Sequence, residues 1–220
     1  EEAGHSVTPT FPSETALLPR GYDTALVGLT LKNVGLQLFV DGTCVQTDEG
    51  EFSFTEDGLE SGAAYRLSRR AVWALVNGQR VDIVVDLKPA LSEEQLASRH
   101  SALGIDRKVL RSFMPEAFIA PFLRAHPGLT AAALPAALKA WTFRIEDYKG
   151  FERAVVTAGG VSLKEIVPKT LASRLRPGLF FCGEVLDLDG DTGGYNLQIA
   201  FSTGAAAGAG AAKYLKDLSA

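Results

Sequence analysis

The stretch PGLFFCGEVLDLDGDTGGYNLQIAFSTGAAAGAGAA, residues 177–212, decides the expected fold. Its apolar run, residues 179–182, does not alternate with polar residues, a pattern typical of a strand buried on both faces of a parallel sheet. Gly183 and Glu184 follow this run, and ligands of such sheets bind beyond the carboxyl ends of the strands. We therefore expect Gly183 to allow close backbone approach and Glu184 to accept a hydrogen bond from a ligand hydroxyl. The alternative is a strand that ends in an ordinary turn.

A glycine pair, Gly193 and Gly194, precedes a helix predicted over residues 196–218. A helix N-terminus carries unpaired N–H groups and about half a positive charge. It suits a phosphate, and it equally suits the pyrimidine edge of a flavin, which becomes anionic on reduction. Asn196 is expected to cap the helix, to donate to the ligand, or both. Further along, one face of this helix carries small residues that favour close packing: Gly204, Gly208 and Ala211.

A calcium loop is the rival interpretation of the segment before this helix. Asp187, Asp189 and Asp191 occupy positions 1, 3 and 5 of an EF-hand pattern. Thr192 then stands where glycine is needed, and Gln198 stands where the bidentate glutamate belongs. We expect no metal site here, and none at the three isolated histidines, His5, His100 and His126.

The first part of the chain, residues 6–88, is rich in short apolar runs separated by turn signals. The runs fall at residues 26–31, 34–40, 43–47 and 51–55, and a helix is expected over residues 59–74. Residues 80–87 alternate well enough to form a strand, with Val81, Ile83, Val85 and Leu87 on one face. Together these elements indicate a small antiparallel β-unit.

Residues 92–140 change to a helical pattern. Ser92 with the acidic residues after it predicts a helix start, Pro115 suits the first position of a second helix, and residues 128–140 form an alanine-rich third. The simplest interpretation is a cluster of three helices; two helices and a loop is the alternative. Strands are expected again at residues 141–148 and 151–157.

Composition limits the possible classes of protein. The 220 residues are 46% hydrophobic and 22% charged, with a formal net charge of −4, and this mix favours a globular fold without a nucleic-acid surface. Only Cys44 and Cys182 are present, which favours a reducing, cytoplasmic environment. No apolar stretch reaches the ~18 residues that a membrane span needs. Residues 1–5 resemble the last turn of a helix closed by Gly4, and we expect that a preceding segment has been lost.

The run from Val156 to Ala212 resembles the carboxy-terminal signature of the aminoacetone oxidase-like NAD(P)/FAD-dependent flavoproteins, a bacterial family of longer proteins. Weaker similarity extends upstream through residues 4–12, 29–34 and 54–62. Two departures stand out: no G-x-G-x-x-G phosphate loop occurs in the sequence, and residues 58–63 carry an extra residue and no proline where the family has Gly-Leu-Ser-Gly-Pro.

The resemblance implies an α+β or α/β fold, in which an inserted antiparallel β-unit and a small helical cluster are joined to the carboxy-terminal part of a Rossmann-like FAD-binding domain. Residues 1–91 would be the β-rich part of the insert, 92–140 its helical cluster, and 141–220 the return to the FAD-binding domain. The residues implied to contact FAD are Thr157, Gly159, Gly160, Gly183, Glu184, Gly193, Gly194, Tyr195, Asn196, Leu197 and Gln198.

The implied function is hydride or electron transfer between FAD and a small organic substrate, with NAD(P)H as a reductant. The missing amino-terminal half of the protein would be a partner, and no nucleic acid or membrane is expected. No side chain is marked as catalytic; Tyr195 and Cys182 are candidates by position alone, and Cys182 is more often a buried strand residue. The alternative is a non-catalytic binding or interaction module that cannot hold FAD without the missing half.

Overall fold

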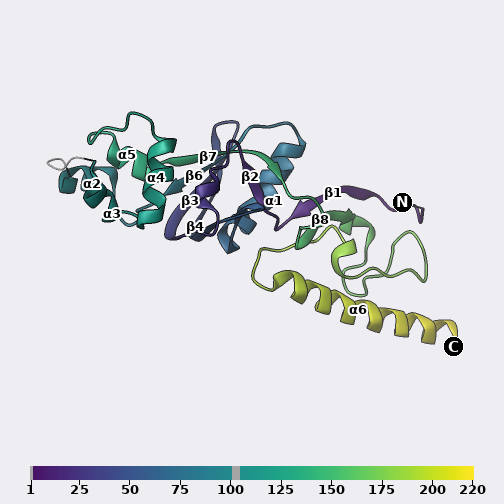
Figure 1. The fold of residues 1–220 in the computed structure, drawn as a ribbon. Coiled ribbons are helices and arrows are strands. Elements are labelled where there is room, and N and C mark those ends of the chain that lie inside the picture. The colour runs from purple at the N-terminus through teal and green to yellow at the C-terminus, as the bar shows by residue number, and fades with distance from the viewer. Residues whose placement is uncertain (1, 101–104) are drawn as a thin grey trace. The chain divides into compact units, whose positions relative to one another are not determined.

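The computed structural model describes residues 2–100 and 105–220 (Figure 1). The chain divides into two compact units. We call Thr15–Lys149 the barrel unit, and Glu1–Glu14 with Gly150–Ala220 the terminal unit. Whether residues 141–220 return to a FAD-binding domain stays a prediction. Within this part of the chain, β7 (Trp141–Tyr148) belongs to the barrel unit by its strand pairing.

The barrel unit is built on a closed antiparallel sheet. Its strands follow the order β2 (Leu17–Pro19), β5 (Gly58–Glu60), β4 (Thr43–Thr55), β3 (Thr30–Val40), β6 (Val81–Asp86) and β7. Closure comes from β7, which pairs with β6 on one side and with β2 on the other. Closure gives each strand of the barrel a partner on both sides, which the alternating pattern of the individual strands could not predict.

Aromatic side chains fill the barrel because they alternate along its strands. Phe52 and Phe54 point to the same face of β4, and Trp141 and Phe143 to the same face of β7. The Phe54 ring lies 5.4 Å from Phe52 and 5.5 Å from Phe143, centroid to centroid, and Trp141 lies 5.1 Å from Phe143. Burying each such ring contributes roughly 1.5–3 kcal/mol.

The barrel strands differ from the expected runs at two places. Leu26 belongs to a 3-10 turn, η1 (Thr24–Leu26), because Asp23 accepts a hydrogen bond from Ala25 N and caps that turn. β3 and β4 are each continuous, where shorter runs were predicted at residues 34–40, 43–47 and 51–55. A bulge between Leu31 and Val34, with Asn33 at φ 53°, lets β3 continue through a polar interruption.

The helices of the barrel unit lie close to their expected positions. α1 (Gly62–Val76) starts after Ser61, whose hydroxyl accepts from Ala64 N. α2 (Glu93–His100), α4 (Glu116–Ala125) and α5 (Leu134–Lys139) match the predicted cluster, grouped together in Figure 1. α3 (Arg107–Arg111) was not predicted, and residues 101–104 lie outside the described residues. α5 is shorter than residues 128–140 because Thr130 holds a turn before it.

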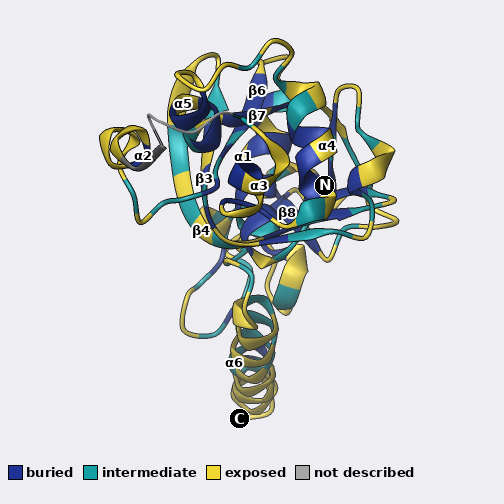
Figure 2. Cartoon of the chain, turned by 60° about the vertical axis from the view of Figure 1, so that its left-hand side comes forward, coloured by how far each residue is buried: buried dark blue, intermediate teal, exposed yellow. Residues whose placement is uncertain are grey.

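The terminal unit contains less regular structure. β1 (Val7–Ser13) and β8 (Val156–Val161) form a two-stranded antiparallel sheet, followed by the 3-10 turns η2 (Leu163–Glu165) and η3 (Gly183–Val185) and by α6 (Tyr195–Leu218). Figure 2 shows that most of α6 is exposed. The small core consists of Val161, Ile166, Leu171, Leu186 and Ala207, with Phe180 and Phe181 packed against it. No described helix is long and apolar enough to cross a membrane.

Three expectations for the terminal unit are wrong. Residues 179–182 form no buried parallel strand: Phe180 makes only an isolated antiparallel bridge to Ala172. The run lacks alternation because Phe180 packs on Tyr214 and Phe181 on His5. Cys182 is exposed rather than buried. The strand expected at residues 151–157 begins only at Val156, because residues 151–153 turn, with Arg153 N bonded to Gly150 O.

The small-residue face of α6 makes no close contact with the described residues. Gly204 and Gly208 have open space where a Cβ would stand, so no described part of the chain packs closely there. The close approach occurs at Gly210 instead, where a Cβ would lie 2.5 Å from Thr170 O. Among the described residues the closely packed face of α6 is therefore the one that carries Gly210, and close packing of the face with Gly204 and Gly208 stays a prediction.

Candidate functional site

A cavity of about 490 Å³ lies beside the first turn of α6, within the terminal unit. This volume falls within the range of small-molecule pockets, ~300–1,000 Å³. Five of the predicted site residues line it: Glu184, Gly193, Gly194, Asn196 and Leu197. The remaining lining residues are Glu14, Val155, Val156, Leu188, Thr192, Ile199 and Ala200.

The glycine pair opens the helix toward this cavity. Gly194 is the N-cap of α6 in the left-handed conformation (φ 91°), and no side chain makes a capping hydrogen bond there. The N–H groups of Tyr195, Asn196 and Leu197 are the first three of the helix and therefore have no intrahelical acceptor. A Cβ at Gly194 would meet nothing within 4 Å. The cavity therefore receives unshielded N–H donors and the positive end of the helix dipole.

Asn196 does not cap the helix, which was one of its two expected roles, and donation to a ligand stays a prediction. Its amide nitrogen donates to Gly190 O (2.9 Å) and to Glu14 Oε1 (3.1 Å), and its Oδ1 accepts from Gly190 N (2.8 Å). Both amide protons are thereby used, since an asparagine amide has two. Asn196 is a positioning residue that joins the loop at Gly190 and the end of β1 to the first turn of α6.

Glu14 is the site residue that sequence reasoning missed. It follows β1, far along the chain from α6, and only 6% of it is exposed. Burial raises the pKa of its carboxyl group, nearby Asp191 and Asp189 raise it further, and the Thr192 and Asn196 side chains oppose the shift. The Thr192 hydroxyl is buried beside it but lacks good hydrogen-bond geometry. The backbone of Glu14 has a positive φ of 49°, and no sequence motif marks this residue as part of a site.

Glu184 and Gly183 lie together beside α6, as expected, although in η3 rather than at a strand end. Glu184 Oε1 accepts from Thr157 N at 3.2 Å, and the residue is exposed at the cavity wall. Gly183, at φ 70°, donates its N–H to Thr203 Oγ1 of α6 at 2.8 Å. Contact between Glu184 and a ribityl chain stays a prediction.

Thr157, Gly159 and Gly160, which the resemblance implies to contact FAD, lie in the strand β8, and that contact stays a prediction. A Cβ at Gly159 would lie 2.4 Å from Pro9 O, and one at Gly160 would lie 2.6 Å from Val185 O. These glycines are required because neighbouring backbones approach closely. They do not line the cavity.

Tyr195 and Gln198 face away from the main cavity. They line a neighbouring hollow of about 310 Å³ with Gly190, Asp191 and Ile199, and Tyr195 is 64% exposed. Gln198 Nε2 donates to Ser202 Oγ at 2.8 Å. Cys182 lines neither space. The two candidates for a catalytic side chain therefore lie outside the cavity that holds the helix N-terminus.

No group of three or more acidic, histidine or cysteine side chains in the described parts of the chain is arranged to hold a metal ion. His5 bonds Ser173 Oγ and His126 bonds Phe122 O, each at 2.8 Å. The side chain of His100 lies outside the described residues.

The cavity combines apolar walls with the partial positive charge of a helix N-terminus at one end. Val155, Val156, Leu188 and Ile199 supply the apolar surface, and the first turn of α6 supplies N–H donors. This donor set fits a flat ring system whose electron-rich polar edge meets a helix N-terminus. The described residues are thus compatible with the ring end of a flavin.

A family model described as "HI0933-like protein Rossmann domain" matches residues 1–210. The chain is 29% identical to a 3-dehydro-bile acid delta(4,6)-reductase of Clostridium scindens, over 96% of this chain and 56% of that protein. It is 25% identical to a ribosomal RNA dihydrouridine synthase of Haemophilus influenzae, over 89% of this chain and 51% of that protein. The chain thus spans about half the length of these relatives. Neither carries the aminoacetone oxidase name, so the resemblance holds at the broader family level.

Proposed function

Because the chain belongs to the HI0933-like Rossmann-domain family, we propose that it forms the ring-facing part of an FAD-dependent oxidoreductase. The reaction is hydride or electron transfer between flavin and a small organic substrate, with NAD(P)H as reductant. One observation carries the proposal: the uncapped N-terminus of α6 opens into an apolar cavity of about 490 Å³. The reductase name of one relative supports the same reaction class.

The residues that would hold the ring are those of the first turn and the cavity walls. The bound flavin would supply the redox chemistry, and reduction makes its pyrimidine edge anionic. The backbone N–H groups of Asn196 and Leu197, which line the cavity, would stabilise that charge. Burial raises the pKa of the Glu14 carboxyl group, which lines the same cavity. The apolar walls exclude water, which strengthens these interactions.

The rest of the cofactor would be held by polypeptide outside this sequence. No G-x-G-x-x-G loop occurs here, and the relatives are about twice as long as the part that aligns. One face of α6 also exposes apolar residues: Leu197 is 65% exposed, Phe201 70% and Leu215 63%. Gly204 and Gly208 fall on that face, and they would let another segment approach closely. We infer that this face meets the amino-terminal half of the protein.

The direct test is binding of lumiflavin, which carries the ring without the ribityl phosphate and adenosine parts. The purified chain should quench lumiflavin fluorescence saturably, and Gly194→Val should weaken binding about tenfold or more, because a β-branched residue is strained at φ 91° and would intrude on the cavity mouth. Gly78→Val is the matched control, since Gly78 lies at φ 72° in open space in the barrel unit.

The alternative, a non-catalytic interaction module, predicts a different result. Lumiflavin and FAD would then bind neither to the chain nor to the full-length protein. Equal weakening by Gly194→Val and Gly78→Val would also count against the placement of the ring, because it would reflect loss of folding.

A further inference from the structure

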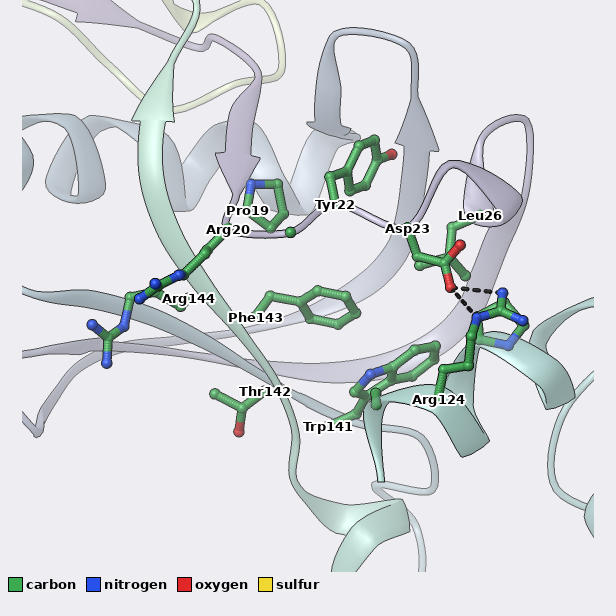
Figure 3. Close-up of a pocket in the computed structure, with 13 residues that line it drawn as sticks. Pro19, Arg20, Tyr22, Asp23, Leu26, Arg124, Trp141, Thr142, Phe143 and Arg144 are labelled. Carbon is green, nitrogen blue, oxygen red and sulfur yellow. Dashed lines mark hydrogen bonds and ion pairs between the residues drawn. The ribbon is translucent and has the colours of Figure 1, made fainter. Parts of the chain in front are cut away.

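A second cavity, of about 550 Å³, lies in the barrel unit where β7, the segment after β2 and the end of α4 meet. Figure 3 shows the residues that line it. None of them was predicted from the sequence as a site residue. The residues that carry the argument are Pro19, Arg20, Leu26, Trp141, Phe143 and Arg144.

The floor of this cavity is apolar and rigid. Trp141 and Phe143 come from alternate positions of β7 and are only 2% and 9% exposed. Their rings lie 6.4 Å and 5.5 Å from that of Phe54, inside the barrel, so the aromatic core holds them in place. Pro19 and Leu26 extend the apolar surface. A preformed floor of this kind binds a flat apolar body at little ordering cost.

The rim is basic. Figure 3 shows Arg20 and Arg144 on one side of the floor, and the ion pair of Arg124 with Asp23 on the other. Arg124 donates to Asp23 Oδ2 through both Nε (2.9 Å) and Nη2 (2.7 Å), so its charge is neutralised locally. The other side of the rim has no such balance.

Arg144 and Arg20 retain donors for a ligand. Arg144 uses Nε to reach Asp82 Oδ1 at 2.6 Å, and Arg80 already bonds the other oxygen of Asp82. Two guanidinium groups thus share one carboxylate, and the Nη groups of Arg144 remain for another acceptor. Arg20 meets Glu146 only at 3.4 Å, and the two side chains are 72% and 52% exposed. Such a pair contributes little and exchanges readily for a better anion.

We propose that this cavity binds a small organic anion. Arg20 and Arg144 hold its carboxylate or phosphate, and its flat apolar body lies over Phe143 and Trp141. A nucleotide is the alternative ligand, and the test distinguishes it from an apolar anion. The inference is independent of the flavin proposal, since the lining residues all belong to the barrel unit.

Tryptophan fluorescence provides the test. The chain has two tryptophans, and Trp73 does not line this cavity, so Trp73→Phe leaves Trp141 as a reporter at its floor. In that background we expect saturable changes with 2-naphthoate and with 2-naphthyl phosphate, and binding of 2-naphthalenemethanol about tenfold weaker. The tighter of the two anions identifies the natural head group as carboxylate or phosphate. Uridine monophosphate is the nucleotide probe.

Three further variants locate the binding. Arg20→Gln should weaken both anions about fivefold and leave the alcohol unchanged. Lys32→Gln is the matched control, because Lys32 is also 72% exposed and paired with one glutamate but does not line the cavity. Ala125→Phe, at an exposed lining position, should abolish binding of all the probes.

Several results would overturn the proposal. These are the absence of a saturable signal with either anion, equal effects of Arg20→Gln and Lys32→Gln, and unchanged binding in Ala125→Phe. Tighter binding of uridine monophosphate than of naphthyl phosphate would replace the apolar anion with a nucleotide.

Discussion

The barrel unit and the terminal unit bury their side chains in different ways. The barrel closes its sheet and surrounds an aromatic core, in which Phe52 is 0% and Phe54 1% exposed. The terminal unit has a two-stranded sheet, and of the 24 residues of α6 only Ala207 and Gly210 are buried. We therefore expect the barrel unit to be the more stable of the two. The terminal unit depends on the contact that α6 makes through Ala207 and Gly210 and on hydrogen bonds such as those of Asn196.

The largest expected effect is in the barrel. Phe54→Ala should lower the free energy of unfolding of this unit by about 3–5 kcal/mol, because it removes a ring that packs against Phe52, Phe143 and Trp141. Both tryptophans lie in the barrel unit, so the urea midpoint of tryptophan fluorescence measures the loss.

Phe201→Ala is the matched control in the terminal unit. Phe201 is 70% exposed on α6, and its removal should change stability by no more than about 0.5 kcal/mol. Losses of similar size in the two variants would show that the units do not differ as described.

A smaller effect is expected from a pair of glycines on α6. Gly210→Ala should loosen the helix by about 1–3 kcal/mol, because its Cβ would collide with Thr170 O. The Cβ added by Gly208→Ala would have no atom within 4 Å, so this substitution should stabilise the helix by about 0.5–1 kcal/mol. Hydrogen exchange of α6 peptides measures both. If Gly208→Ala destabilised the isolated chain, α6 would have to pack through the opposite face.

The smallest effect is a pH dependence of opposite sign in the two units. Burial raises the pKa of Glu14 above its ordinary 4.5, so its contribution is present below that value and is lost as pH rises through the raised pKa. The hydrogen bond from Arg66 lowers the pKa of Asp48 below 3.8, so its contribution is present above that value and is lost as pH falls through the lowered pKa.

Two variants separate these contributions. Glu14→Gln should flatten the decline in α6 exchange protection above pH 4.5, after correction for intrinsic exchange rates. Asp48→Asn should flatten the acid limb of the barrel unit's urea midpoint. An unchanged pH profile in Glu14→Gln would mean that this carboxyl titrates normally in the folded protein.

Local patterns gave correct predictions where the cause is local. Ser92 was predicted to start a helix, and its hydroxyl accepts a hydrogen bond from Gln95 N. The alternation of Val81, Ile83 and Val85 predicted a strand with one buried face, and all three are fully buried. The start of α6 was predicted within one residue from its glycine pair.

Predictions failed where distant contacts decide the environment. The run at Phe180 and Phe181 lacks alternation because two different neighbours, Tyr214 and His5, cover its two sides. The same composition describes a buried strand, so the sequence alone could not distinguish the two. Glu14 was missed because its environment comes from Asn196 and Thr192, far away in the chain.

The sequence by itself determined the helix starts, the alternating strands and the glycine pair before α6, since these depend on backbone geometry within a few residues. Only the tertiary structure decided the closure of the barrel by β7, the face on which α6 packs, and the cavities that gather Glu14 with α6 and Arg20 with Arg144. Those features join residues widely separated in the chain, and the periodicity of a single segment carries no information about its distant neighbours.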